Sequence, residues 1–175
     1  MRFDRLLALL GTGWAIQPEA LAAMAEALDT LMAGSHPRVD AFAAGDAQNV
    51  EDLPYELRGG VAVIPVVGTL VKRNAWLSCF TTYAEVQAAM AQARDDPRAA
   101  ALLLLEESPG GTVDGCQEFA EWVKALDAVK PVYAYADGLM ASAAYWIGSG
   151  AREIAAPPTA VVGSIGVLAV HHDRS

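Results

Sequence analysis

The sequence predicts an α/β fold with a largely parallel sheet. From residue 61 onward, short β-branched or apolar runs alternate with segments of helical periodicity, as in successive βαβ units. The run AALLLLEE (100–107) is continuously apolar over the length of a strand, which is typical of a strand covered on both faces. The segment 113–129 instead places Phe119, Trp122, Val123 and Leu126 on one side of a helix.

The N-terminal part of the chain has a different character. Residues 1–15 suggest a short amphipathic helix, and residues 18–33 combine Pro18 in a first turn with an apolar helical stripe that stops at Gly34. Residues 34–60 are punctuated by Gly, Pro, Asp and Asn, which predicts a linker or an extended arm. We therefore divide the chain into an N-terminal helical segment with linker, residues 1–58, and a domain over residues 59–175.

Within that domain the elements alternate in order. Strands are expected at 61–70, 100–107, 131–137, 153–156 and 166–170, and helices at 81–96, 113–129 and 141–151. Pro65 cannot donate a ladder hydrogen bond, so the first strand is predicted to lie at a sheet edge or to contain a bulge. Thr81 or Thr82 is the expected cap of the first of these helices, and Pro97 follows its end.

Composition narrows the function classes. Hydrophobic residues make up 54% of the chain, enough for a real core, and the net charge of −9 argues against a general nucleic-acid binder. The longest uncharged run, 154–170, is interrupted by prolines and glycines, so no membrane span is expected. Cys79 and Cys116 do not form a disulfide framework and are interpreted as buried or half-buried thiols.

Two strand-to-helix junctions carry groups that chemistry could use. In EESPGGTV (106–113), Gly110 and Gly111 could aim backbone N–H groups at an oxyanion, or they could form an ordinary turn. Ser142 follows the strand 131–137, where it is either a helix N-cap or a nucleophile at the positive end of a helix. Neither a phosphate loop of the Walker type nor a G-x-S-x-G elbow is present.

Histidines offer one possible acceptor for the Ser142 proton. A triad would need His171 or His172 beside Ser142, with Asp137 or Asp173 behind the imidazole. Neighbouring strand residues point to opposite faces, so at most one of the two histidines could serve. Solvated histidines after a strand are the simpler interpretation.

Lysines are the second possible acceptor for the Ser142 proton. Lys72 ends the first predicted strand and would act as a base only if it were desolvated or placed near other cations. Lys124 and Lys130 are interpreted as solvated surface groups. Ser164, in the turn GSIGV (163–167), is interpreted as structural, with placement of a base as the alternative.

Taken in order, these segments resemble the S49 peptidases, the signal-peptide-peptidase-A-like enzymes that include phage prohead proteases. The resemblance rests on AVIPVVGTL (62–70), LLLLEESPGGTV (102–113) and the long segment from KPVYAYADGLMASAAYW to GSIGV (130–167), and it covers residues 59–173. It implies a Clp-protease/crotonase-like spiral of β-β-α units. It also implies peptide hydrolysis by a serine nucleophile and a lysine base, without metal or organic cofactor.

The resemblance assigns roles to three residues. Ser142 matches the nucleophile, Gly111 an oxyanion-hole donor, and Ala143, where many relatives have glycine, would be the second donor. The lysine base of single-domain members lies beyond GSIGV, and no lysine follows Lys130 in this sequence. We expect the sequence to be a domain truncated at its C-terminus; a lysine from a neighbouring subunit and an inactive protein are the alternatives.

Partners and location follow only from the resemblance. It implies a protein or peptide substrate, assembly into homo-oligomers and, for phage-type members, cleavage of scaffold and capsid proteins in the bacterial cytoplasm or the prohead. Two other functions stay open. One is a crotonase-like acyl-thioester enzyme that holds an enolate with the SPGG N–H groups, and the other is a catalytically inactive assembly homologue.

Overall fold

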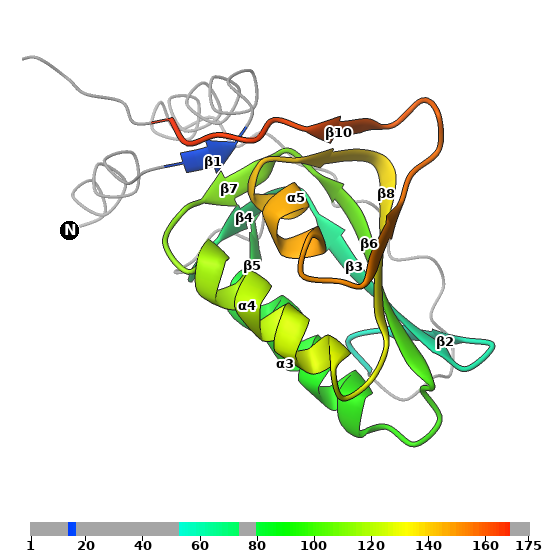
Figure 1. Cartoon of the computed structure of the whole chain (residues 1–175). Coiled ribbons are helices and arrows are strands. Elements are labelled where there is room, and N and C mark those ends of the chain that lie inside the picture. Colours follow the sequence, from blue (N-terminus) through cyan, green and yellow to red (C-terminus); the bar gives the residue numbers. More distant parts are fainter. Residues whose placement is uncertain (1–13, 17–52, 74–79, 169–175) are drawn as a thin grey trace, which may run out of the picture.

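The computed structural model describes residues 14–16, 53–73 and 80–168 (Figure 1). The strands are β1 Trp14–Ile16, β2 Glu56–Arg58, β3 Val61–Val67, β4 Thr69–Val71, β5 Phe80–Thr82, β6 Ala101–Ser108, β7 Gly110–Thr112, β8 Val132–Ala141, β9 Glu153–Ala155 and β10 Val161–Gly163. The helices are α3 Tyr83–Asp95, α4 Cys116–Asp127 and α5 Ala143–Gly148. The predicted α/β class is confirmed.

The described strands form two sheets. In the larger sheet the order is β10-β8-β6-β3-β2, with β9 also paired to β8, and every pair except β2 with β3 is parallel. In the smaller sheet the order is β1-β7-β4-β5, and only β1 with β7 is antiparallel. The prediction of a largely parallel sheet is therefore confirmed.

The core lies between the larger sheet and the helices, which pack against one another (Figure 1). Along β6, Leu102, Leu104 and Glu106 are fully buried, whereas the residues between them are half-buried. The apolar run of β6 is thus buried alternately rather than equally on both faces.

Pro65 does not place β3 at the edge of the sheet. β3 lies between β6 and β2 and pairs with β6 in continuous register from Val61 to Val67, without a bulge. β2, however, covers only Val61–Val63, so Pro65 occupies a part of β3 that has β6 as its one neighbour in this sheet. The prediction was wrong for the strand, although its physical reason holds at the residue.

Two short strands occur where the sequence predicted a helix and a linker. β2 lies within the predicted linker and forms a hairpin with β3 through Gly59 and Gly60, whose φ angles of 56° and 83° suit a two-residue turn. β1 includes Trp14 and Ala15, which were assigned to an amphipathic helix. The helix expected at 18–33 lies outside the described residues, and the division of the chain at residue 58 stays a prediction.

The two helices predicted at 81–96 and 113–129 are confirmed as α3 and α4, although they begin later, at Tyr83 and Cys116. The Thr82 hydroxyl accepts a hydrogen bond from the Glu85 N–H at 3.0 Å, and the Glu85 carboxylate accepts from the Thr82 N–H at 2.9 Å, a complete capping box. In α4, Phe119 and Val123 are buried as expected. No described helix has the length and apolar character needed to cross a membrane.

The C-terminal elements differ from their predicted bounds. β8 is longer than expected and pairs through Tyr133–Tyr135 with β9 and through Leu139–Ala141 with β10. β10 lies in a region predicted as a turn, and residues 166 and 167, predicted as strand, are not in one. α5 starts at Ala143 rather than at residue 141, because Ala141 still belongs to β8.

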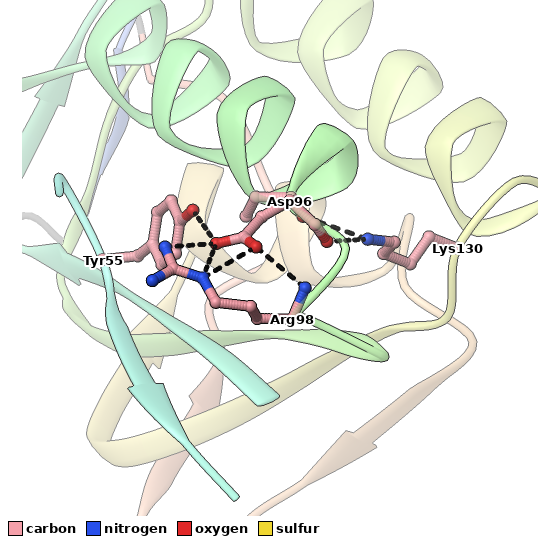
Figure 2. Close-up of polar contacts among 5 residues, drawn as sticks. Tyr55, Asp96, Arg98 and Lys130 are labelled. Atoms are coloured by element: carbon pink, nitrogen blue, oxygen red, sulfur yellow. Dashed lines mark hydrogen bonds and ion pairs between the residues drawn. The ribbon is translucent and has the colours of Figure 1, made fainter. Parts of the chain in front are cut away.

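Asp96, at the end of α3, joins separate segments of the chain (Figure 2). Its carboxylate accepts hydrogen bonds from the Tyr55 hydroxyl at 2.8 Å and from the Arg98 backbone N–H at 2.8 Å. Arg98, which also pairs with it through the guanidinium, holds the pKa of Asp96 well below its usual value. Lys130 donates to the backbone carbonyls of Ala93 and Asp96 at 3.2 and 2.9 Å, so it satisfies the end of α3 rather than standing free in solvent.

Candidate active site

Ser142 lies between the end of β8 and the start of α5, and it is 5% exposed. Its backbone has φ 56° and ψ −114°, a region that residues other than glycine rarely adopt. The turn is held at both ends, because the Ser142 N–H donates to the Gly163 carbonyl at 2.7 Å and its carbonyl accepts from the Trp146 N–H at 2.9 Å. The fold therefore maintains a strained backbone at this serine.

The Ser142 side chain does not cap α5. It makes no hydrogen bond to the helix, and its hydroxyl has only a long contact, 3.4 Å, to the Gly166 carbonyl. The N-cap interpretation of this residue is therefore wrong in its chemistry, although Ser142 does occupy the position before the helix. A sharp strand-to-helix turn that keeps a serine hydroxyl out of the helix is a known way to present a nucleophile.

A pocket of about 320 Å³ opens beside Ser142. Its lining is mostly apolar and comes from α5 and its C-terminal cap, and from the segment after β10. The lining residues are Ser142, Tyr145, Trp146, Ser149, Ile165, Gly166 and Val167. A pocket of this size can hold one side chain of a bound peptide, and the Ser142 hydroxyl in its wall would then contact the peptide backbone beside that side chain.

Gly111 and Ala143 lie on elements that pack together, β7 and α5. Ala143 is the first residue of α5, so its backbone N–H has no acceptor within the helix and lies at the positive end of the helix. Gly111 is buried in the middle of β7, where the backbone of Leu70 comes very close to it. A Cβ added at Gly111 would lie 1.8 Å from the Leu70 carbonyl oxygen. The two residues singled out as donors thus belong to neighbouring elements.

A buried thiol fixes the start of α5 against α4. The Cys116 thiol donates to the Ala143 carbonyl at 3.7 Å, and the hydroxyl of Tyr83, also buried, donates to the Thr112 carbonyl at 2.5 Å next to Gly111. Burial raises the pKa of Cys116 to about 12. The prediction of a buried thiol is confirmed for Cys116, while Cys79 lies outside the described residues.

We expect Cys116 to resist alkylation in the folded protein. The thiolate is the reactive form, and a buried thiol with a raised pKa supplies almost none of it at neutral pH. Iodoacetamide treatment followed by peptide mass spectrometry should leave Cys116 unmodified at pH 8 and modify it fully in 6 M guanidinium, with free cysteine as the reference for reagent strength. Rapid modification of Cys116 without denaturant would show that the start of α5 opens readily.

The structure removes some acid–base candidates and leaves others untested. Lys72 pairs with Asp114 at 2.6 Å, and neither Lys72, Lys124 nor Lys130 borders the pocket. His171 and His172 lie outside the described residues. Over residues 53–73 and 80–168, no group of three or more His, Cys, Asp and Glu side chains is arranged to hold a metal ion.

Sequence reasoning missed Glu106, a fully buried carboxyl behind α5. Neither of its side-chain oxygens has a hydrogen-bond partner among the described residues, and burial raises its pKa well above the usual value. One oxygen would be 2.9 Å from a Cβ added at Gly148 of α5. The signal was present in the sequence, because Glu106 follows Leu102 and Leu104 at the same strand spacing and so points to the same face.

Comparison with protein families identifies the part of the chain around Ser142. Residues 124–174 match the family model "Peptidase family S49", a range that includes Ser142 and Ala143. The resemblance to the S49 peptidases is confirmed. The matched range also includes β10 and the segment that lines the pocket.

Two curated proteins are similar to this chain over a longer stretch than the family model. The chain is 38% identical over 120 residues to "Capsid assembly protease C" of Escherichia phage lambda, which covers 67% of this chain and 27% of that protein. It is 42% identical over 121 residues to "Protease 4" of Salmonella typhi, 67% of this chain and 19% of that protein. The chain spans about a quarter of the length of the first and a fifth of the second.

A solved structure of an enoyl-CoA hydratase/isomerase family member is also similar. It shares 22% sequence identity with a TM-score of 0.42, over 58% of this chain and 45% of that one. The observed fold is mixed α/β with mainly parallel sheets. The finer prediction of a Clp-protease/crotonase-like spiral stays a prediction.

Proposed function

We propose that this chain carries the nucleophile and oxyanion hole of an S49-type serine endopeptidase. The observation that supports this most strongly is Ser142 itself. Its backbone is strained, its hydroxyl is not used by the helix, and it borders an apolar pocket. Strain of this kind costs roughly 1–3 kcal/mol and is found mainly where function requires it.

The proposed reaction is acyl transfer. The Ser142 hydroxyl attacks the carbonyl carbon of a peptide bond, its proton passes to a base, and negative charge develops on the carbonyl oxygen. The C–N bond then breaks as the protonated base gives its proton to the leaving amine, and water, deprotonated by the same base, hydrolyses the Ser142 ester and releases the carboxylic acid. The N–H groups of Gly111 and Ala143 donate hydrogen bonds to that oxygen. Removing one such donor typically lowers the rate by about 100- to 1000-fold.

The base is proposed to be a lysine that does not lie among Lys72, Lys124 and Lys130. Lys72 and Lys130 already have close partners, and Lys124 lies on the exposed side of α4. A lysine from outside these 175 residues, for example from a neighbouring subunit, would supply the proton acceptor. Such a lysine needs a desolvated position to be neutral at working pH.

The pocket suggests the substrate. Tyr145, Trp146, Ile165 and Val167 form walls that favour an apolar side chain next to the scissile bond. By the likeness to the phage lambda protein named "Capsid assembly protease C", we propose scaffold or capsid proteins as substrates, a homo-oligomeric enzyme, and action in the bacterial cytoplasm or the prohead.

A fluorophosphonate probe tests the proposal on the natural full-length protein. Mass spectrometry should place the label on Ser142, and Ser142→Ala should lower labelling by about 100-fold or more, because the nucleophile is gone. Ser149→Ala is the matched control: this serine lines the same pocket, but its hydroxyl donates to the Trp146 carbonyl at 2.6 Å. Labelling should survive this change.

The alternatives give different results. Equal labelling of wild type and Ser142→Ala would remove Ser142 as the nucleophile. Absence of label together with tight coenzyme A binding would favour an acyl-thioester protein, and absence of both would favour an inactive assembly homologue.

A further inference from the structure

The strand that carries Gly111 has an unexpected neighbour. β1 pairs antiparallel with β7, with Trp14 opposite Thr112, Ala15 opposite Gly111 and Ile16 opposite Gly110. The two strands are far apart in sequence, yet they lie side by side in one sheet (Figure 1). β4 occupies the other edge of β7, with Leu70 opposite Gly111.

The β1 edge is the one that a peptide would use. To give its carbonyl oxygen to the Gly111 N–H, a substrate backbone has to run beside β7, and extended peptides commonly bind by adding a strand to a sheet edge. The β4 edge is closed, because β4 itself pairs there, with Leu70 opposite Gly111, and β5 continues the sheet beyond it. Residues 14–16 therefore lie where the substrate strand would pair.

We propose that Trp14–Ile16 is a built-in, displaceable occupant of the peptide-binding edge of β7. This inference rests on the proposed function and adds its regulation: the N-terminal segment competes with substrate for the strand that carries the oxyanion donor. Displacement is feasible because β1 pairs through three residues, whereas β3 and β6 pair through seven. A tethered competitor lowers the apparent affinity of any peptide in solution.

Deletion of residues 1–16 from the full-length protein tests the proposal. The probe is a fluorescein-labelled peptide with the sequence of residues 12–18, TGWAIQP, measured by fluorescence anisotropy. The deletion should strengthen binding of this peptide at least tenfold relative to wild type, while a peptide of the same sequence with N-methylated backbone amides, which cannot pair as a strand, should gain nothing. Equal binding by the two proteins would overturn the proposal.

Two point variants test the same proposal in case the deletion protein does not fold. In an antiparallel strand alternate N–H groups face the partner, so one of Ala15→Pro and Ile16→Pro removes a bond to β7 and the other does not. One variant should therefore bind the peptide more tightly than the other. If the deletion and both proline variants lose their cooperative thermal transition, β1 is a required part of the sheet and the proposal fails.

The same proteins separate this proposal from the peptidase assignment. Fluorophosphonate labelling measures the reactivity of Ser142, whereas anisotropy of the labelled peptide measures binding at the β7 edge. Tighter peptide binding without any Ser142 label would contradict the peptidase and keep the edge occupant. Ser142 labelling with unchanged peptide binding would support the peptidase and contradict the proposal that β1 occupies the peptide-binding edge.

Discussion

Gly111→Ala should destabilise the protein by about 3 kcal/mol or more, at the upper end of the range for overpacking a core. The new methyl group would lie 1.8 Å from the carbonyl oxygen of Leu70 and 2.7 Å from its Cα. These are backbone atoms, so no side-chain rotation can relieve the contact, and β4 would have to move away from β7. Chemical denaturation followed by circular dichroism measures the change.

Gly166→Ala is the control for this substitution. Gly166 has no atom within 4 Å of an added Cβ and its φ is not in the left-handed region, so its stability should change by less than about 0.5 kcal/mol. A Gly111→Ala protein as stable as Gly166→Ala would mean that β4 and β7 are further apart than described. The contact also explains why residue 111 is a glycine. Alanine would supply the same backbone N–H, but its methyl group would collide with the backbone of Leu70.

The sequence predicted where the site lies better than how it is shaped. Ser142 was placed correctly between a strand and a helix from local patterns, since apolar runs and small residues mark both elements. Its φ of 56° was not predictable, because positive φ normally signals glycine and the cause here lies in the contacts of Ser142 with Gly163 and Trp146. The hydrogen bond from the Ser142 N–H to the Gly163 carbonyl joins residues far apart in the sequence, so it leaves no mark in a local pattern.

The errors in strand bounds have a similar origin. The sequence predicts a strand over residues 131–137, but β8 continues through Gly138, at φ 89°, to Ala141. Its register against β6 shifts there, so that Glu106 pairs with Ala136 and Ser108 with Met140. β1 and β10 were missed because a three-residue strand is defined by the neighbour it pairs with rather than by its own composition.

Glu106→Gln should make the protein more stable than wild type at alkaline pH, and the advantage should grow as the pH rises. Burial raises the pKa of Glu106 well above its ordinary value of 4.5, and no described residue donates a hydrogen bond to the carboxyl. The folded protein therefore keeps a proton that the unfolded chain releases above about pH 4.5. Over that window the free energy of unfolding falls by about 1.4 kcal/mol per pH unit, until the pH reaches the folded pKa.

Denaturation curves at several pH values between 4 and 9 measure this slope in wild type, Glu106→Gln and Glu107→Gln. The stabilisation that the protonated Glu106 supplies is greatest below pH 4.5 and is lost as the pH rises. Above pH 4.5 the free energy of unfolding should therefore fall more steeply with pH in wild type than in Glu106→Gln. Glu107 is the exposed neighbour of Glu106 on β6, and its replacement is the control for the loss of one carboxylate from this strand. Parallel curves for wild type and Glu106→Gln would contradict a proton held at Glu106.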